Sequence, residues 1–132
     1  EVDFKNTLNL IKKIKFINSY SFIFSPRPGT IASNLDTLNK KIAIQRLEMV
    51  QVALFKNQAE VNKSFEKKTI EVLVENRTED RKKLFGRSEY MTSVLFYGTD
   101  DLIGKIVKVK ILKGNQNTLL GEIISTTNQK VA

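Results

Sequence analysis

The spacing of apolar residues changes about halfway along the chain. In residues 3–15 apolar side chains recur every three or four positions, as Phe4, Leu8 and Ile11 do. Residues 35–63 continue this spacing over a longer stretch, with one stripe formed by Leu47, Val50, Leu54 and Val61. From residue 66 onward apolar and polar residues alternate, as they do in half-buried strands. The pattern therefore predicts helices first and strands afterwards.

Polar residues near the start of each helical pattern are candidate caps. Asp3 is a plausible N-cap of the first helix, and Asp36 can cap the second. Between the two helices, the pattern predicts a strand over Phe16–Ser25, with Tyr20, Phe22 and Phe24 on one face. Pro26 and Pro28 end it, because two prolines fix two φ angles and remove two hydrogen-bond donors.

Five short strands are predicted in the second half of the chain. The turns between them contain Gly, Asn and acidic residues, which suit tight reversals. Their expected ranges are 70–75, 84–87, 93–97, 105–112 and 119–124. This number and spacing of strands favour a small antiparallel β-barrel related to the OB class, so that the fold class is α+β.

Composition excludes several kinds of chemistry. The 132 residues include neither Cys nor His. Disulfides, thiolate zinc sites, iron–sulfur ligation and Ser-His-Asp catalysis are therefore absent from this chain. No apolar run approaches the roughly 18 residues that span a bilayer, so we expect no membrane partner and a cytoplasmic location. We also expect the chain to be a piece of a longer protein.

The formal charge of +8 favours a polyanionic partner, nucleic acid first. In the expected strand 105–112, Val107, Val109 and Ile111 take one face and Lys108 and Lys110 take the other. Lysines in this arrangement suit the phosphates of a nucleic-acid backbone. The alternative is an ordinary solvated face with lysines that protect a sheet edge.

A second basic cluster lies before and within the strand 84–87. Lys82, Lys83 and Arg87 are the candidate phosphate ligands there, although a short charge run is also typical of a solvated loop. Phe96 and Tyr97 must point to opposite faces, so one belongs to the core and the other is exposed. An exposed Tyr97 is a candidate for stacking on a base, and an exposed Tyr without such a role is the alternative.

The remaining charged motifs carry weaker indications. Arg27 lies between two prolines, where it could anchor an anion or form an internal ion pair that stabilises a turn. The pairs Glu79-Asp80 and Asp100-Asp101 are adjacent in sequence, so their side chains diverge. We interpret them as turn formers and not as general acid/base pairs.

Several motifs, taken in order, resemble the tRNA methylthiotransferase family. The Phe24-Ser25-Pro26-Arg27-Pro28-Gly29-Thr30 stretch is the most specific of them. The others are Asp3-Phe4 with Thr7-Leu8, Arg46-Leu47, Val72-Leu73-Val74-Glu75, Gly86-Arg87, and Leu119-Leu120-Gly121-Glu122. Ile31, Asn76 and Ser88 depart from the usual family residues Pro, Gly and Thr.

The resemblance implies a division of the chain. Residues 1–34 would end a radical-SAM domain, 35–63 would be a linking helix, 64–126 would be a TRAM RNA-binding barrel, and 127–132 a tail. The family enzymes use two [4Fe-4S] clusters and S-adenosylmethionine, and this chain lacks the cysteines that hold the clusters. The resemblance therefore implies that the chain binds no cofactor and is inactive alone.

The same resemblance implies the partner and the reaction. The family enzyme would convert N6-isopentenyladenosine beside the anticodon, at position 37, to its 2-methylthio derivative. We expect this chain to bind tRNA near the anticodon stem-loop, to bind no DNA and to be a monomer. Two alternatives stay open: part of an enzyme that methylthiolates a ribosomal-protein aspartate, and a free-standing TRAM-type RNA-binding module.

Overall fold

A computed structural model describes residues 1–126 of the chain. The chain divides into two compact units, which meet between Asn57 and Gln58, and each unit is described by itself below. No helix in the described range is long and apolar enough to cross a lipid bilayer. The expected tail, residues 127–132, lies outside the described residues.

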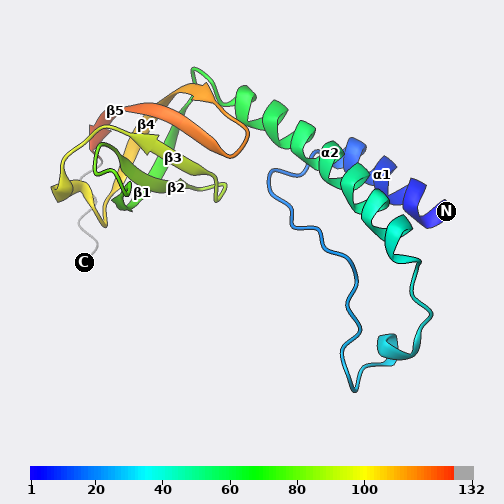
Figure 1. The fold of residues 1–132 in the computed structure, drawn as a ribbon. Coiled ribbons are helices and arrows are strands. Elements are labelled where there is room, and N and C mark those ends of the chain that lie inside the picture. The colour runs from blue at the N-terminus through cyan, green and yellow to red at the C-terminus, as the bar shows by residue number, and fades with distance from the viewer. Residues whose placement is uncertain (127–132) are drawn as a thin grey trace. The chain divides into compact units, whose positions relative to one another are not determined.

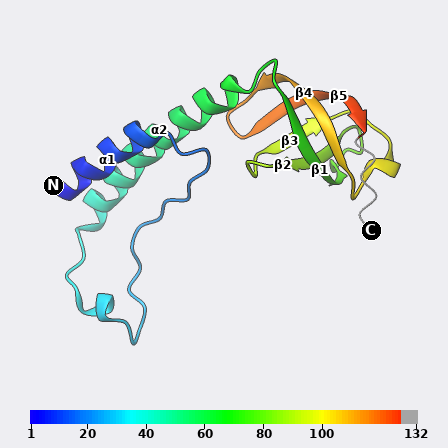
Figure 2. The ribbon, with the colours of Figure 1, turned by 180° about the vertical axis from the view of Figure 1, so that it is seen from behind.

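The first unit is built on two helices that lie side by side (Figures 1 and 2). Helix α1 spans Val2–Ile14, and helix α2 spans Lys40–Ser64 and so extends into the second unit. The buried side chain of Asn57 donates a 2.7 Å hydrogen bond to the Ile11 carbonyl. At the other end of α1, Arg46 pairs with Glu1 at 2.7 Å.

The helix caps differ from those expected. Glu1 is the N-cap of α1, so Asp3 lies in the first turn, where a carboxylate still suits the helix dipole. Helix α2 begins at Lys40, and the side chain of Asn39 accepts a 2.9 Å hydrogen bond from the Lys41 amide. Asp36 is too far upstream to cap this helix, because it lies in the irregular stretch between a short 3₁₀ helix, η1 (Ile31–Asn34), and Lys40.

The predicted strand Phe16–Ser25 is wrong. This segment is irregular and runs from α1 toward η1 (Figure 1). Its aromatic side chains are exposed, with Tyr20 at 90% and Phe22 at 83%. A strand needs a neighbour for its backbone donors and acceptors. None of the strand pairs formed by residues 1–126 includes this segment, so an alternating sequence alone does not make it a strand.

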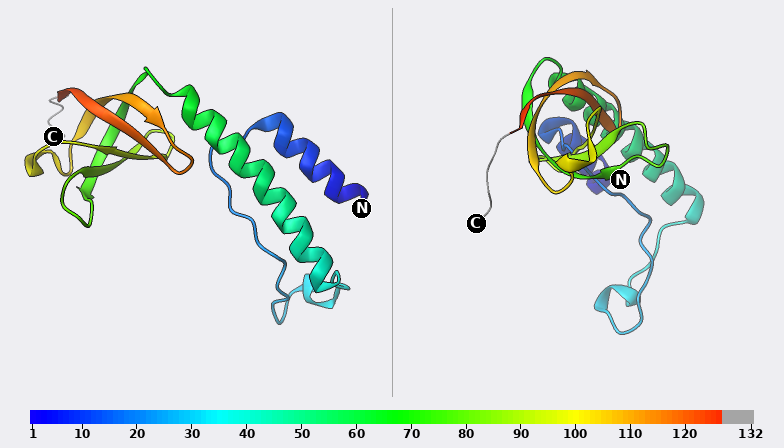
Figure 3. Two further views of the ribbon diagram at one scale, coloured as in Figure 1. Left: turned by 45° about the horizontal axis from the view of Figure 1, so that its top comes forward. Right: turned by 90° about the vertical axis from the view of Figure 1, so that its left-hand side faces the viewer.

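The second unit is a closed five-stranded barrel (Figure 3). Its strands are β1 (Thr69–Arg77), β2 (Leu84–Ser88), β3 (Ser93–Phe96), β4 (Ile106–Gly114) and β5 (Thr118–Thr126). All five predicted strands are thus confirmed. The order around the barrel is β1-β2-β3-β5-β4. Strands β3 and β5 pair in parallel, which corrects the expectation of a wholly antiparallel barrel.

The barrel core follows the alternation of apolar residues along each strand. Val107, Val109 and Ile111 point inward and are fully buried, as predicted for β4. Phe96 is the largest of the fully buried side chains. The other fully buried apolar residues of the strands are Val72, Val74, Leu84, Val94 and Leu119. Together these side chains fix which residues must face outward.

The last turn of α2 is joined to the end of β4 by a close approach of two backbones. A Cβ atom on Gly114 would lie 2.2 Å from the Asn62 carbonyl oxygen, so this position requires glycine. The buried side chain of Asn62 donates hydrogen bonds to the carbonyls of Asn115 and Gln116, at 2.7 and 2.8 Å. The β4–β5 turn is therefore anchored to the helix end by contacts within this unit.

Candidate nucleic-acid interface

The outer face of β2 and β3 combines aromatic and basic side chains. Phe85 on β2 lies opposite Leu95 on β3, and Arg87 lies opposite Ser93. Tyr97 follows the last residue of β3, and its exposed fraction is 69%. The neighbouring residue Phe96 is only 1% exposed, which confirms that the two aromatic rings take opposite faces.

Cations lie against the aromatic rings of this face. The Lys83 ammonium is 5.4 Å from the centroid of the Tyr97 ring, and the Arg87 guanidinium is 5.5 Å from that of Phe85. Both distances fall within the range of cation–π attraction. Arg87 also pairs with Glu75 on β1 at 3.2 Å. We call this surface the cation–aromatic face, formed by Lys82, Lys83, Phe85, Arg87, Leu95 and Tyr97.

The loop that carries Lys82 and Lys83 is held by its own hydrogen bonds. The Thr78 amide donates to the Lys83 carbonyl at 2.9 Å, and the Lys83 amide donates to the Thr78 hydroxyl at 3.2 Å. Asp80 accepts hydrogen bonds from the Thr78 hydroxyl and the Lys82 amide, at 2.6 and 3.1 Å. These bonds shape a turn in which Arg81 has a φ of 56°. The two lysines are thus presented by a defined loop.

Those hydrogen bonds also determine the acidity of Asp80. The bond from the Thr78 hydroxyl is the largest cause that lowers the pKa of Asp80 below its ordinary value, followed by the Lys82 amide. The positive charges of Lys82 and Lys83 act in the same direction. Asp80 is therefore ionised at neutral pH and accepts both bonds as a carboxylate, which confirms its interpretation as a turn former.

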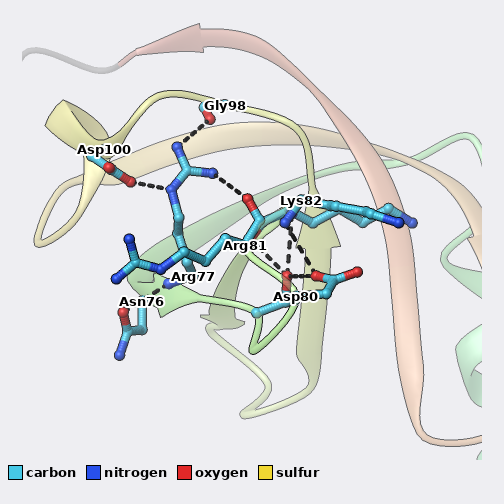
Figure 4. A network of polar contacts seen from close by, with 9 residues as sticks. Asn76, Arg77, Asp80, Arg81, Lys82, Gly98 and Asp100 are labelled. Atoms are coloured by element: carbon cyan, nitrogen blue, oxygen red, sulfur yellow. Dashed lines mark hydrogen bonds and ion pairs between the residues drawn. The ribbon is translucent and has the colours of Figure 1, made fainter.

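Arg77 connects this loop to two other segments (Figure 4). Its guanidinium pairs with Asp100 and donates 3.2 Å hydrogen bonds to the carbonyls of Arg81 and Gly98. The end of β1, the β1–β2 loop and the segment after β3 are thereby joined. Sequence reasoning missed Arg77, because its partner Asp100 is remote in the chain and no local pattern links the two.

A shallow hollow of about 640 Å³ lies between the loop and the sheet. Phe85, Leu95 and Tyr97 supply its apolar wall. Its polar lining comes from the end of β1 and the loop: Arg77, Thr78, Glu79, Asp80, Lys82 and Lys83. The hollow thus offers an aromatic surface beside two lysines, which is the combination that single-stranded nucleic acids bind.

Lys108 and Lys110 lie on a different part of the barrel. Both are exposed on β4, as predicted, but β4 pairs with β1 and β5 and not with β2 or β3. Lys108 lies opposite Glu71, and Lys110 lies opposite Glu122. Acidic residues directly across the strand reduce the positive potential there. The structure therefore gathers Lys82, Lys83, Arg87 and Tyr97, and leaves the β4 lysines apart.

Arg27 lies on the exposed loop of the first unit. Within residues 1–126 its side chain has no ion pair, so the alternative of an internal ion pair is not formed in this part of the chain. Its carbonyl accepts hydrogen bonds from the Thr30 amide and hydroxyl, at 3.3 and 2.8 Å. The turn is therefore held by the backbone of Arg27, and the residue is exposed.

The residues present do not fit a metal cluster. The chain has neither Cys nor His. The described residues also contain no group of three acidic side chains that could hold a metal ion. Asp100 and Asp101 instead open the short helix η2 (Asp100–Leu102), as expected for a turn-forming pair.

Comparison with known proteins gives two findings. Residues 63–124 match the family model of the TRAM domain. Over 132 residues, the chain is 57% identical to a tRNA-2-methylthio-N(6)-dimethylallyladenosine synthase of Pelagibacter ubique, and covers 30% of that protein. Enzymes of the same name from Ruthia magnifica and Clostridium novyi are 44% and 41% identical over 95% and 94% of the chain, which covers 28% of each.

These findings confirm the resemblance inferred from the sequence. The chain is related along its length to proteins named as tRNA-modifying synthases, and the barrel is the part that matches the TRAM model. The chain spans less than a third of the length of these curated relatives. The boundaries expected at residues 34 and 63 stay predictions.

Proposed function

We propose that this chain belongs to the tRNA methylthiotransferase family and is the part of such an enzyme that holds the RNA. The substrate would be a tRNA whose adenosine at position 37 carries an N6-isopentenyl group. The complete enzyme would convert that base to its 2-methylthio derivative. The chain described here would bind the anticodon stem-loop in the cytoplasm and act as a monomer.

The observation that carries this proposal is the cation–aromatic face. Lys82, Lys83 and Arg87 lie on one side of the barrel together with an exposed tyrosine. Lysine and arginine bind phosphates of any sequence, while aromatic rings bind the faces of unpaired bases. Such a surface holds RNA without selecting a particular base, so base selection would belong to another part of the enzyme.

The methylthiolation chemistry would lie in the longer part of the enzyme that this chain does not span. The family's two [4Fe-4S] clusters need cysteine ligands, and this chain has none. Binding of S-adenosylmethionine would likewise fall outside these residues. We accordingly propose that the chain alone has no methylthiotransferase activity.

The first unit would connect the barrel to that longer part. The alternating segment Phe16–Ser25 is irregular here and exposes its aromatic side chains. We propose that these exposed aromatic side chains contact the preceding domain of the complete enzyme, which would bury them. Arg27, on the loop that follows, would then lie close to that domain.

The proposal is tested by the salt dependence of RNA binding. We would measure the affinity of the 132-residue chain for an anticodon stem-loop RNA between 50 and 200 mM salt. The slope of log K against log salt is negative, and each lost phosphate contact makes it shallower by about 0.7 to 0.9. The double variant K82A/K83A should therefore make the slope shallower by roughly 1.4 to 1.8.

Two matched double variants serve as controls. K108A/K110A removes the same charge from β4, and K40A/K41A removes it from the start of α2, where loss of a cation does not oppose the helix dipole. Both should leave the slope within about 0.5 of the original. Equal effects of all three pairs would mean that only net charge matters, and absence of RNA binding by the unaltered chain would overturn the proposal.

A further inference from the structure

The ring of Tyr97 is exposed beside a hollow whose walls are already formed. The chain has three tyrosines. The ring of Tyr90 packs on Phe65 with centroids 5.1 Å apart, and Tyr20 belongs to the irregular segment of the first unit. Tyr97 instead follows a barrel strand, with the buried Phe96 before it. The backbone at Tyr97 is thus fixed while 69% of the residue stays open to solvent.

The lining of the hollow has two parts that differ in chemistry. Phe85 and Leu95, opposite each other on β2 and β3, form an apolar part next to the tyrosine. Lys82 and Lys83 line the hollow from the loop that Thr78 and Asp80 hold together. An apolar planar group fits the apolar part and the ring, and an anionic group attached to it fits the lysines.

A nucleotide has these two parts joined in one unit. We propose that the hollow is a subsite for one unpaired RNA base, which stacks on the Tyr97 ring while the adjoining phosphates bind Lys82 and Lys83. The inference rests on the proposed function and adds which nucleotide the barrel selects: one that is free of base pairing. Bases inside a duplex are stacked on their neighbours and cannot reach the ring.

Lys83 serves two purposes in this subsite. Its ammonium lies 5.4 Å from the Tyr97 centroid. Its backbone is fixed by the Thr78 hydroxyl, so the flexible stem alone decides whether the charge meets the ring or a phosphate. A base can stack on the part of the ring that stays exposed, and Lys83 then neutralises the phosphate that the base brings with it.

The stacking residue is tested with substitutions that separate ring from charge. Tyr97→Ala and Tyr97→Leu should weaken binding of a single-stranded oligoribonucleotide by about 5- to 150-fold. Tyr97→Phe and Tyr97→Trp keep a ring and should bind within about threefold of the original. None of the four should change the salt slope, because tyrosine contributes no charge. Tyr20→Ala, which removes a 90% exposed tyrosine from the first unit, is the matched control and should bind normally.

A second readout follows the ring directly. In a variant with Tyr20→Phe and Tyr90→Phe, Tyr97 is the one remaining tyrosine of a chain without tryptophan. Stacking predicts that its fluorescence is quenched by the single strand. A fully paired duplex of the same strand, or a strand made wholly of abasic nucleotides, should quench it much less.

The outcomes distinguish this subsite from the proposed function. If Tyr97→Ala and Tyr97→Leu bind as well as the original while K82A/K83A shows the reduced salt dependence predicted above, the barrel binds RNA and the stacking subsite is refuted. Equal quenching by the duplex and the single strand would also refute it. If the unaltered chain binds no RNA, the proposed function and the subsite that rests on it are both refuted, and this face would instead suit a protein partner.

Discussion

Replacing Arg77 with methionine tests whether the loop that carries Lys82 and Lys83 is held in place by the hydrogen bonds of Arg77. Methionine keeps most of the aliphatic stem and removes the guanidinium, which joins Asp100 and the carbonyls of Arg81 and Gly98. The pair with Asp100 adds little, because that carboxylate is 70% exposed and exposed pairs contribute about 0–1 kcal/mol. Most of the expected loss of stability comes from the two hydrogen bonds that the charged guanidinium donates.

The expected cost of Arg77→Met is about 1–3 kcal/mol of barrel stability, since water can partly replace the lost donor at both carbonyls. Urea unfolding followed by NMR signals of barrel amides measures it, and hydrogen exchange at Thr78 and Lys83 reports on the loop itself. Arg81→Ala is the control. It removes the same charge, keeps the Arg81 carbonyl, and should change stability by less than about 0.5 kcal/mol.

RNA binding gives the functional side of this prediction. Arg77→Met should weaken RNA binding without lowering the salt slope, because Lys82 and Lys83 remain but their loop is less ordered. A loss of stability below about 0.5 kcal/mol together with unchanged exchange at Thr78 would show that Arg77 does not hold the loop. In that case the loop would be held by Thr78 and Asp80 alone.

Three further predictions concern the core, the loop and the first unit. Phe96→Ala should lower barrel stability by about 3–5 kcal/mol in urea unfolding, because its ring is 1% exposed and leaves a cavity; a loss below about 1 kcal/mol would contradict the packing described. Asp80 should titrate by NMR below the ordinary aspartate pKa, and Thr78→Val should raise that pKa. Because the pKa of Asp80 is lowered in the folded state, its contribution to folding stability is present at neutral pH and is lost as pH falls below about 4. Amides of residues 16–25 should exchange with solvent far faster than those of β1 and β4, and comparable protection would mean that this segment is paired after all.

The barrel was predictable because its signals are local. In β1 and β4 every second residue is apolar, and these same residues, Val72, Val74, Val107 and Val109, are buried in the structure. The outward direction of Lys108, Lys110 and Tyr97 follows from the same alternation. A strand that supplies its own two-residue period, between clear turns, needs no further information to be recognised.

The features that the sequence predicted wrongly or missed all depend on residues distant in the chain. Phe16–Ser25 has a strand-like period but no neighbouring strand within residues 1–126. The parallel pairing of β3 with β5 is set by closure of the barrel, and no sequence pattern in either strand records it. Arg77 gains its role from Asp100 and two carbonyls that only folding brings near. The candidate site shows the same division, since residue types were predictable and their grouping on one face was not.

The most direct test of the account is an NMR titration of the 132-residue chain with an anticodon stem-loop RNA. Backbone amide shifts locate the bound surface without any substitution. If the cation–aromatic face holds the RNA, the largest changes fall on Lys82, Lys83, Arg87 and Tyr97. Changes centred on Lys108 and Lys110 of β4, with that face unaffected, would contradict it.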